Sequence, residues 1–158
     1  MIRKVKYSVM IVCSFAAGYF ISCVQQGKRV FEIHEQARKN VSIIRAFNMW
    51  MALKQRNHSL YPFFERNNYH EIAVYGMHYL GERLKDELQG TDIVIKYVID
   101  KNAENIHVGV KVVQPEDVLE DVDAIIVTPI FYFEEIKRKL SAKVRCPVIS
   151  LEDIINNV

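Results

Sequence analysis

The sequence predicts an α/β domain over residues 57–158, built on a five-stranded, doubly wound parallel sheet with strand order 3-2-1-4-5. The first observation is a βαβ unit at residues 71–100, where an apolar strand, a glycine turn, an amphipathic helix and a second apolar strand follow one another. The second is that both strands, IAVY and IVIKYVI, are largely apolar on both faces, as parallel strands covered by helices are. The third is that strand and helix patterns keep alternating after residue 100, which extends the same sheet.

The elements of this domain can be assigned in order. Asn57 to Ser59 interrupt the preceding helical pattern, and Ser59 is expected to cap a short helix with Pro62 in its first turn. The first strand is expected at residues 72–75, a turn opens at Gly76, a helix runs through Leu88, and the second strand covers residues 93–99.

The second half of the domain repeats the alternation. A third strand is expected at 108–113, a short helix at 114–120 and a continuous apolar strand at 124–128, which suits the centre of a sheet. Thr128 is expected to cap a helix that starts at Pro129 and runs to Leu140. A fifth strand at 147–150 then leads into a terminal helical turn at 151–156, with two acids at its positive end.

The composition allows one such domain and disfavours one class of partner. The chain has 158 residues, 50% of them hydrophobic, which is enough for a core. The net charge is +2, and Lys and Arg are interleaved with acids instead of forming a basic stripe, which argues against nucleic-acid binding. Cys13, Cys23 and Cys146 lack metal-ligand spacing, so we interpret them as free thiols in a reducing compartment or within lipid.

The N-terminal region contains an uncharged run, YSVMIVCSFAAGYFISCV, at residues 7–24. As a helix it would rise about 27 Å, close to the roughly 30 Å of a bilayer core, so we predict a transmembrane anchor within residues 1–27. A cleaved signal peptide, a lipoprotein signal at residues 20–23 and a buried core helix are the alternatives. Ser14 and Gly18 form a small-xxx-small pair that would let two such helices approach closely.

Residues 28–56 predict a long amphipathic connecting helix. Apolar residues recur there at three- and four-residue steps, at Ile33, Ala37, Val41, Ile44, Phe47 and Met51. This stripe either pairs with a second copy as a short coiled-coil stalk or packs against the domain; Trp50 widens the face and favours packing. A homodimer through residues 14–51 follows from the first alternative.

The candidate binding site lies where the strand order reverses, at the carboxyl ends of the first and fourth strands. One loop there, residues 76–81, opens a helix whose free N–H groups favour an anion. The other, residues 128–133, presents a hydroxyl, three aromatic rings and a second helix N-terminus. An acid ends the second strand, where it can accept hydrogen bonds from ribose hydroxyls. The candidate binding residues are Gly76, Met77, His78, Gly81, Asp100, Thr128 and Tyr132.

Residues 71–100 resemble the dinucleotide-binding Rossmann fingerprint. Gly76 matches its first glycine, Gly81 its third and Asp100 its ribose acid, whereas His78 stands where the fingerprint has a second glycine. With the segments Ser59-Leu-x-x-Phe-Phe and Tyr69-x-x-Ile-Ala-Val-Tyr-Gly-Met, residues 57–158 look like the small Rossmann-like domains that accompany bacterial surface-polysaccharide enzymes. The resemblance implies NAD(P) or a nucleoside-diphosphate sugar as the ligand. Each matched residue also has a structural interpretation, the glycines in the turn and helix packing, Asp100 as a turn cap.

The crevice contains few side chains able to carry a reaction. It offers His78, Tyr132 and Thr128, with no carboxylate pair and no Cys/His cluster. We therefore expect a membrane-anchored module that binds a nucleotide or nucleotide-sugar for a partner in bacterial cell-envelope polysaccharide assembly. A small NAD(P)-dependent or sugar-modifying enzyme, and a degenerate Rossmann scaffold that binds only protein, are the alternatives.

Charge counting leaves the membrane orientation open, because basic residues flank the uncharged run on both sides. Nucleotides are cytoplasmic, so we expect a single-pass protein of the inner or cytoplasmic membrane with its α/β domain in the cytoplasm.

Overall fold

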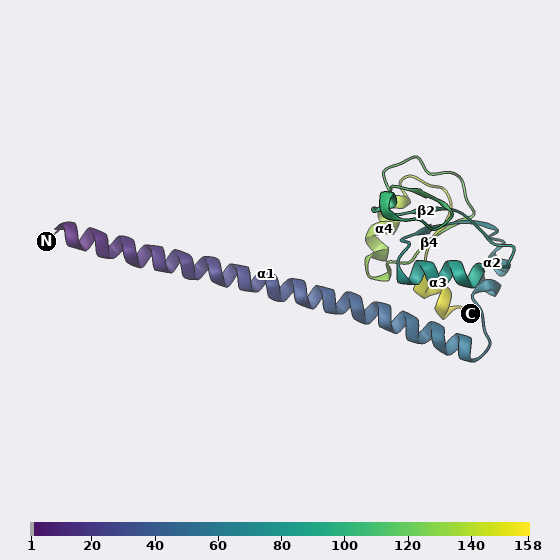
Figure 1. Ribbon diagram of the computed structural model, residues 1–158, viewed down its shortest axis with the longest axis horizontal. Coiled ribbons are helices and arrows are strands. Elements are labelled where there is room, and N and C mark those ends of the chain that lie inside the picture. Colours follow the sequence, from purple (N-terminus) through teal and green to yellow (C-terminus); the bar gives the residue numbers. More distant parts are fainter. Residues whose placement is uncertain (1) are drawn as a thin grey trace. The chain divides into compact units, whose positions relative to one another are not determined.

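A computed structural model describes the backbone of residues 2–158, and the side chains from residue 19 onward except residue 21. The chain divides into two compact units, Met1–Asn40 and Val41–Val158, which we describe separately. The first unit consists of helix α1 alone, and α1 (Ile2–Gln55) continues into the second unit (Figure 1). This confirms the long helix expected over residues 28–56.

The structure describes no side chain before residue 19, so most of the predicted membrane span at residues 7–24 lies outside the described residues. Among the described residues, no helix has an apolar stretch that would reach across a bilayer.

The second unit is built on a five-stranded sheet whose strands are all parallel, in the order β3-β2-β1-β4-β5. This confirms the predicted α/β class, strand direction and strand order. The strands are β1 (Glu71–Tyr75), β2 (Val94–Ile99), β3 (Lys111–Val113), β4 (Ala124–Val127) and β5 (Val148–Ser150). Because β1 lies between β2 and β4, the order reverses at its carboxyl end.

Helices cover both faces of the sheet, as a doubly wound fold requires (Figure 1). One face packs against α2 (Tyr61–Asn67), α3 (Tyr79–Leu88), α5 (Leu151–Asn156) and the end of α1. The other face packs against α4 (Phe133–Leu140). Successive β1 residues alternate between the two cores, with Ile72 and Val74 on the first side and Ala73 and Tyr75 on the second.

The last turns of α1 are part of the domain core. Ala46 is fully buried and Trp50 is 5% exposed, both in the core that contains α3 and α5. The indole N–H of Trp50 donates to the Glu87 carboxylate of α3 at 2.8 Å. The compact unit therefore begins at Val41, before the boundary expected at residue 57. Of the expected stripe, Phe47 packs against this core beside Trp50, whereas Val41, Ile44 and Met51 are more than half exposed.

The short helix predicted at residues 114–120 is absent, and β3 is shorter than its predicted range of 108–113. Gly109 has a φ of +71°, which interrupts an extended strand before Lys111. The Asp117 carboxylate accepts a hydrogen bond from the Gln114 N–H at 2.8 Å, and this bond stabilises a turn in place of the expected helix. The crossover from β3 to β4 is thus irregular, and it packs on the sheet through Leu119 and Val122.

The predicted cap of α2 is also wrong. Leu60, not Ser59, is the residue that precedes the first helical turn, and no side chain caps it locally. Its N–H instead donates to the Glu87 carboxylate of α3 at 2.7 Å. Pro62 lies in the first turn of α2 as predicted, where its missing N–H costs nothing.

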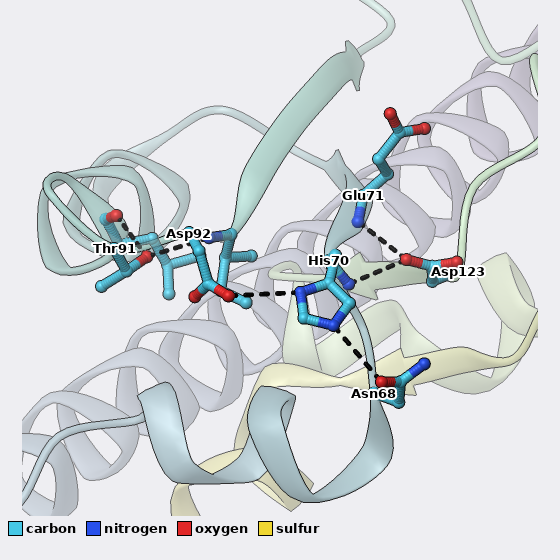
Figure 2. Close-up of polar contacts among 8 residues, drawn as sticks. Asn68, His70, Glu71, Thr91, Asp92 and Asp123 are labelled. Carbon is cyan, nitrogen blue, oxygen red and sulfur yellow. Dashed lines mark hydrogen bonds and ion pairs between the residues drawn. The ribbon is translucent and has the colours of Figure 1, made fainter.

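At the amino ends of the strands, polar contacts tie β1 to its neighbours (Figure 2). The Asp123 carboxylate accepts from the backbone N–H groups of His70 and Glu71 at 2.8 and 2.7 Å. These two hydrogen bonds hold the pKa of Asp123 below its ordinary value. The His70 ring lies between the Asp92 carboxylate and the Asn68 side-chain oxygen, at 3.3 Å from each. At this edge of the sheet these polar groups are paired with one another within the domain. The crevice lies at the opposite edge.

Candidate functional site

Gly76 allows the loops after β1 and β4 to meet. Its φ is +88°, in the left-handed region that favours glycine. A Cβ at this position would lie 2.8 Å from the Pro129 ring and 2.9 Å from the Thr128 hydroxyl oxygen. Both the conformation and the close approach therefore require glycine, and the two predicted loops lie in direct contact.

Gly81 seats the first turn of α3 against the end of β1. A Cβ added there would come within 2.3 Å of the Gly76 carbonyl oxygen. This is the close helix–strand packing for which the dinucleotide-binding motif uses its third glycine. The backbone N–H groups of Tyr79, Leu80 and Gly81 have no acceptor among the described residues, as expected for the open start of a helix.

Thr128 has a structural role that the sequence did not indicate. It is 4% exposed, and its hydroxyl donates to the Gly76 carbonyl at 2.6 Å, with the Tyr75 carbonyl 3.2 Å away. It does not cap a helix, since α4 begins at Phe133 after a short 3₁₀ turn, Ile130–Tyr132. The predicted cap is therefore wrong, and the Thr128 hydroxyl proton is already used to hold the β1 loop.

Asp100 joins the loops after β1 and β2. One carboxylate oxygen accepts from the Met77 N–H at 3.0 Å and the other from the Asn102 N–H at 2.9 Å. Asp100 is half-buried, and each oxygen still has a second lone pair, so hydroxyl groups of a ligand can also donate to it. The Met77 side chain is 5% exposed and belongs to the core, so Met77 supports the loop from below.

His78 and Tyr79 are the exposed side chains at the opening of α3. His78 precedes the first helical residue with φ −113° and ψ −160°, an extended conformation that does not need glycine. Its ring lies edge-on to Tyr79, with 4.1 Å between the ring centroids. His78 lines a pocket together with Tyr79 and Leu80, the first two residues of α3.

Two pockets meet at these residues and share Gly76, Asp100 and Pro129. The smaller, about 200 Å³, lies over the start of α3 and is lined also by His78 and Thr128. The larger, about 410 Å³, opens toward α4. The structure therefore brings Gly76, His78, Asp100, Thr128 and Tyr132 of the candidate set to one crevice, with Met77 and Gly81 beneath it.

The larger pocket contains residues that sequence reasoning missed: Tyr75, Lys101, Glu135, Ile136 and Lys139. Burial raises the pKa of Tyr75, and the nearby carboxylates of Asp100, Glu116 and Glu135 raise it further, so its phenol stays protonated as a donor. Lys101 directly follows Asp100, which is the one sequence signal that placed it here. Glu135 and Lys139 form an ion pair at 2.5 Å, one turn apart on α4.

Ile43 of α1 lines the smaller pocket, and sequence analysis also missed this contact. No local pattern places α1 over the crevice, because the contact depends on the seating of Ala46 and Trp50 in the core.

The crevice is suited to bind an anion and hydroxyl groups together. Unpaired helix N–H groups and the His78 ring are donors for an anion, while Asp100 accepts from hydroxyls. Among the described residues, no cluster of three His, Cys, Asp or Glu side chains has an arrangement that would hold a metal ion.

No protein-family model, curated protein or solved structure matches this chain, so the site is interpreted from its own geometry.

Proposed function

We propose that the domain binds a nucleotide or a nucleotide-sugar at the carboxyl edge of β1 and β4. The observation that carries this proposal is the contact of Gly81 with the Gly76 carbonyl, which fixes the open N–H groups of α3 at the end of β1. A pocket lies directly over these groups, and Asp100 is on its rim. N–H groups that can bind an anion, next to a carboxylate that can accept from hydroxyl groups, match a diphosphate joined to a ribose.

Different parts of such a ligand occupy the two pockets. The diphosphate lies over the start of α3, where His78 donates to it from outside. The ribose hydroxyls donate to Asp100, which borders both pockets. The base extends into the larger pocket, where Tyr132 and Ile136 offer apolar surface and the Tyr75 phenol a hydrogen-bond donor.

The Asp100 carboxylate also predicts a preference among ligands. A phosphate on the ribose 2′ position would bring a second negative charge against a carboxylate that two backbone N–H groups hold in place. NAD and nucleoside-diphosphate sugars should therefore bind more tightly than NADP.

Titration calorimetry on the full-length chain in detergent, with UDP-glucose, NAD and NADP, tests this proposal. His78→Ala should weaken UDP-glucose binding about three- to tenfold, the loss of one charge-assisted hydrogen bond at a partly exposed site. His107→Ala is the matched control, because His107 is exposed and lines neither pocket. Tighter binding by His78→Gly would mean that the ring crowds the phosphate.

Absence of heat with every ligand, in the native chain and in His78→Gly, would reject the nucleotide proposal. That result would favour a scaffold that binds only protein, whereas turnover of NAD(P)H or of the sugar would favour an enzyme.

We further propose that residues 7–24 anchor the chain in the inner or cytoplasmic membrane, with the nucleotide site in the cytoplasm, as an accessory to cell-envelope polysaccharide assembly. The uncharged run and the resemblance of residues 57–158 to polysaccharide-associated domains support this. Membrane fractionation of a C-terminally tagged chain tests it, and recovery in the soluble fraction, or as a form cut near Ser22, would reject the anchor.

A further inference from the structure

Helix α1 has a row of apolar residues that are more than half exposed. Ile33, Ile44 and Met51 are 67%, 66% and 57% exposed, and Val30 is 52% exposed. Counted along the sequence of α1, these residues fall on one heptad repeat, with alternating steps of three and four residues. We call this face the seam; it comprises Cys23, Gln26, Val30, Ile33, Ala37, Asn40, Ile44 and Met51. Phe47 continues the same repeat but packs against the domain core.

The seam is distinct from the face that packs on the domain. Ala46 and Trp50 are buried in the core, and Ile43 lines the crevice. At 100° per residue, these positions lie roughly a third of a turn around the helix axis from the centre of the seam. Val30, Ile33, Ile44 and Met51, which lie on the seam, are exposed.

The positions that flank the seam select the kind of partner. In the heptad, the residues beside the seam that do not pack on the domain include Arg29, His34, Gln36, Val41 and Asn48, while Ile43 and Trp50 flank it on the domain side. Acids are absent from these positions and Arg29 is the one permanent charge, whereas Glu32, Glu35 and Arg45 lie off the seam. A partner helix with neutral flanks fits such a surface, and a second copy of α1 has them.

The polar residues within the seam narrow the choice further. Asn40 bonds to Gln36 at 3.0 Å, and its amide also has donor and acceptor capacity left. An apolar partner would bury that amide without a partner, at a cost in free energy. In a parallel pair in register, Asn40 of one copy faces Asn40 of the other, and two amides satisfy each other.

We propose that two copies of this chain pair in parallel through the seam. The parallel direction rests on the anchor proposed above, because two copies inserted the same way in one membrane present their α1 helices side by side. The pairing itself does not depend on nucleotide binding. In this arrangement equivalent seam residues meet across the pair, so a cysteine placed on the seam lies opposite its own copy.

Disulfide cross-linking of the full-length chain in detergent tests the proposal. All three native cysteines are first changed to serine, and a single cysteine is then introduced by Ala37→Cys on the seam or by Glu35→Cys on the opposite face. Under mild oxidation, Ala37→Cys should form the linked dimer about tenfold faster than Glu35→Cys, because only the seam position brings two Cα atoms within disulfide reach.

A second measurement guards against a trivial effect of the cysteines. Ile44→Asp should convert the dimer to a monomer in sedimentation equilibrium and leave the melting temperature of the domain unchanged, because Ile44 is exposed. Equal cross-linking at positions 35 and 37, or a native chain that sediments as a monomer, would overturn the proposal. Failure of nucleotide binding would leave these outcomes unaffected, so the two proposals can fail separately.

Discussion

Replacement of Glu87 provides the sharpest test of the inference that the end of α1 belongs to the domain. The Glu87 side chain is 5% exposed, accepts two hydrogen bonds and forms one ion pair. The hydrogen-bond donors are the Trp50 indole at 2.8 Å and the Leu60 N–H at 2.7 Å, and the Lys54 ammonium lies 3.2 Å from the carboxylate. One carboxylate thus joins α1, the start of α2 and α3.

The expected cost follows from the donors that lose their acceptor. In Glu87→Ala, the Trp50 and Leu60 N–H groups are both left buried and unpaired, at about 1–3 kcal/mol each, whereas half-exposed Lys54 adds little. We expect a loss of about 2–5 kcal/mol in the free energy of unfolding, or roughly 10 °C in melting temperature. Glu87→Gln retains one acceptor oxygen and should cost about 1–2 kcal/mol.

Urea denaturation of a chain that starts at Val41, followed by tryptophan fluorescence, measures this loss directly, because Trp50 is the one tryptophan in the sequence. Asp86→Ala is the matched control, since Asp86 is the neighbouring acid on α3 and its contact is an exposed ion pair with Arg83 at 3.0 Å. The control should change stability by less than about 0.5 kcal/mol. Equal stability of Glu87→Ala and Asp86→Ala would refute the reasoning and return the domain boundary to residue 57.

Two other predictions concern the two edges of the sheet. Gly81→Ala should destabilise the domain by about 2–4 kcal/mol in the same assay, because the added Cβ meets the Gly76 carbonyl at 2.3 Å. A Gly81→Ala chain as stable as the native one would show that α3 can shift away from β1. Asp123 has a pKa held below its ordinary value, so its contribution to stability is complete above about pH 4 and is lost as the pH falls through the lowered pKa. Asp123→Ala should therefore be less stable than the native chain at pH 7, with a gap that narrows toward pH 2; a constant gap across a pH series of thermal melts would contradict this.

The sheet could be predicted because its signal is local and strong. Residues 72–75 and 124–127 are continuous apolar runs, and in the structure they form the adjacent strands β1 and β4. The helix expected at residues 114–120 was wrong because Pro115 and two acids resemble a helix start, whereas the Asp117 carboxylate stabilises a turn instead.

The two helix caps were wrong for a different reason. Ser59 and Thr128 are good capping residues by type, but the Leu60 N–H finds its acceptor 27 residues away in Glu87, and the Thr128 hydroxyl finds one 52 residues away in Gly76. Partners so distant in sequence leave no local pattern. The same limit applies to the site: Gly76 and Asp100 end strands that a βαβ unit must place together, whereas Ile43 reaches the crevice only through tertiary packing.

The position of Ile43 makes one wall of the crevice a part of helix α1. By thermodynamic linkage, a ligand that contacts this wall must stabilise the seating of α1 by the same free energy that the seated helix adds to ligand affinity. Ile43→Ala in the intact chain should then weaken binding even though no other pocket residue changes. In the opposite direction, a change that moves Ile43 away from the domain should weaken ligand binding.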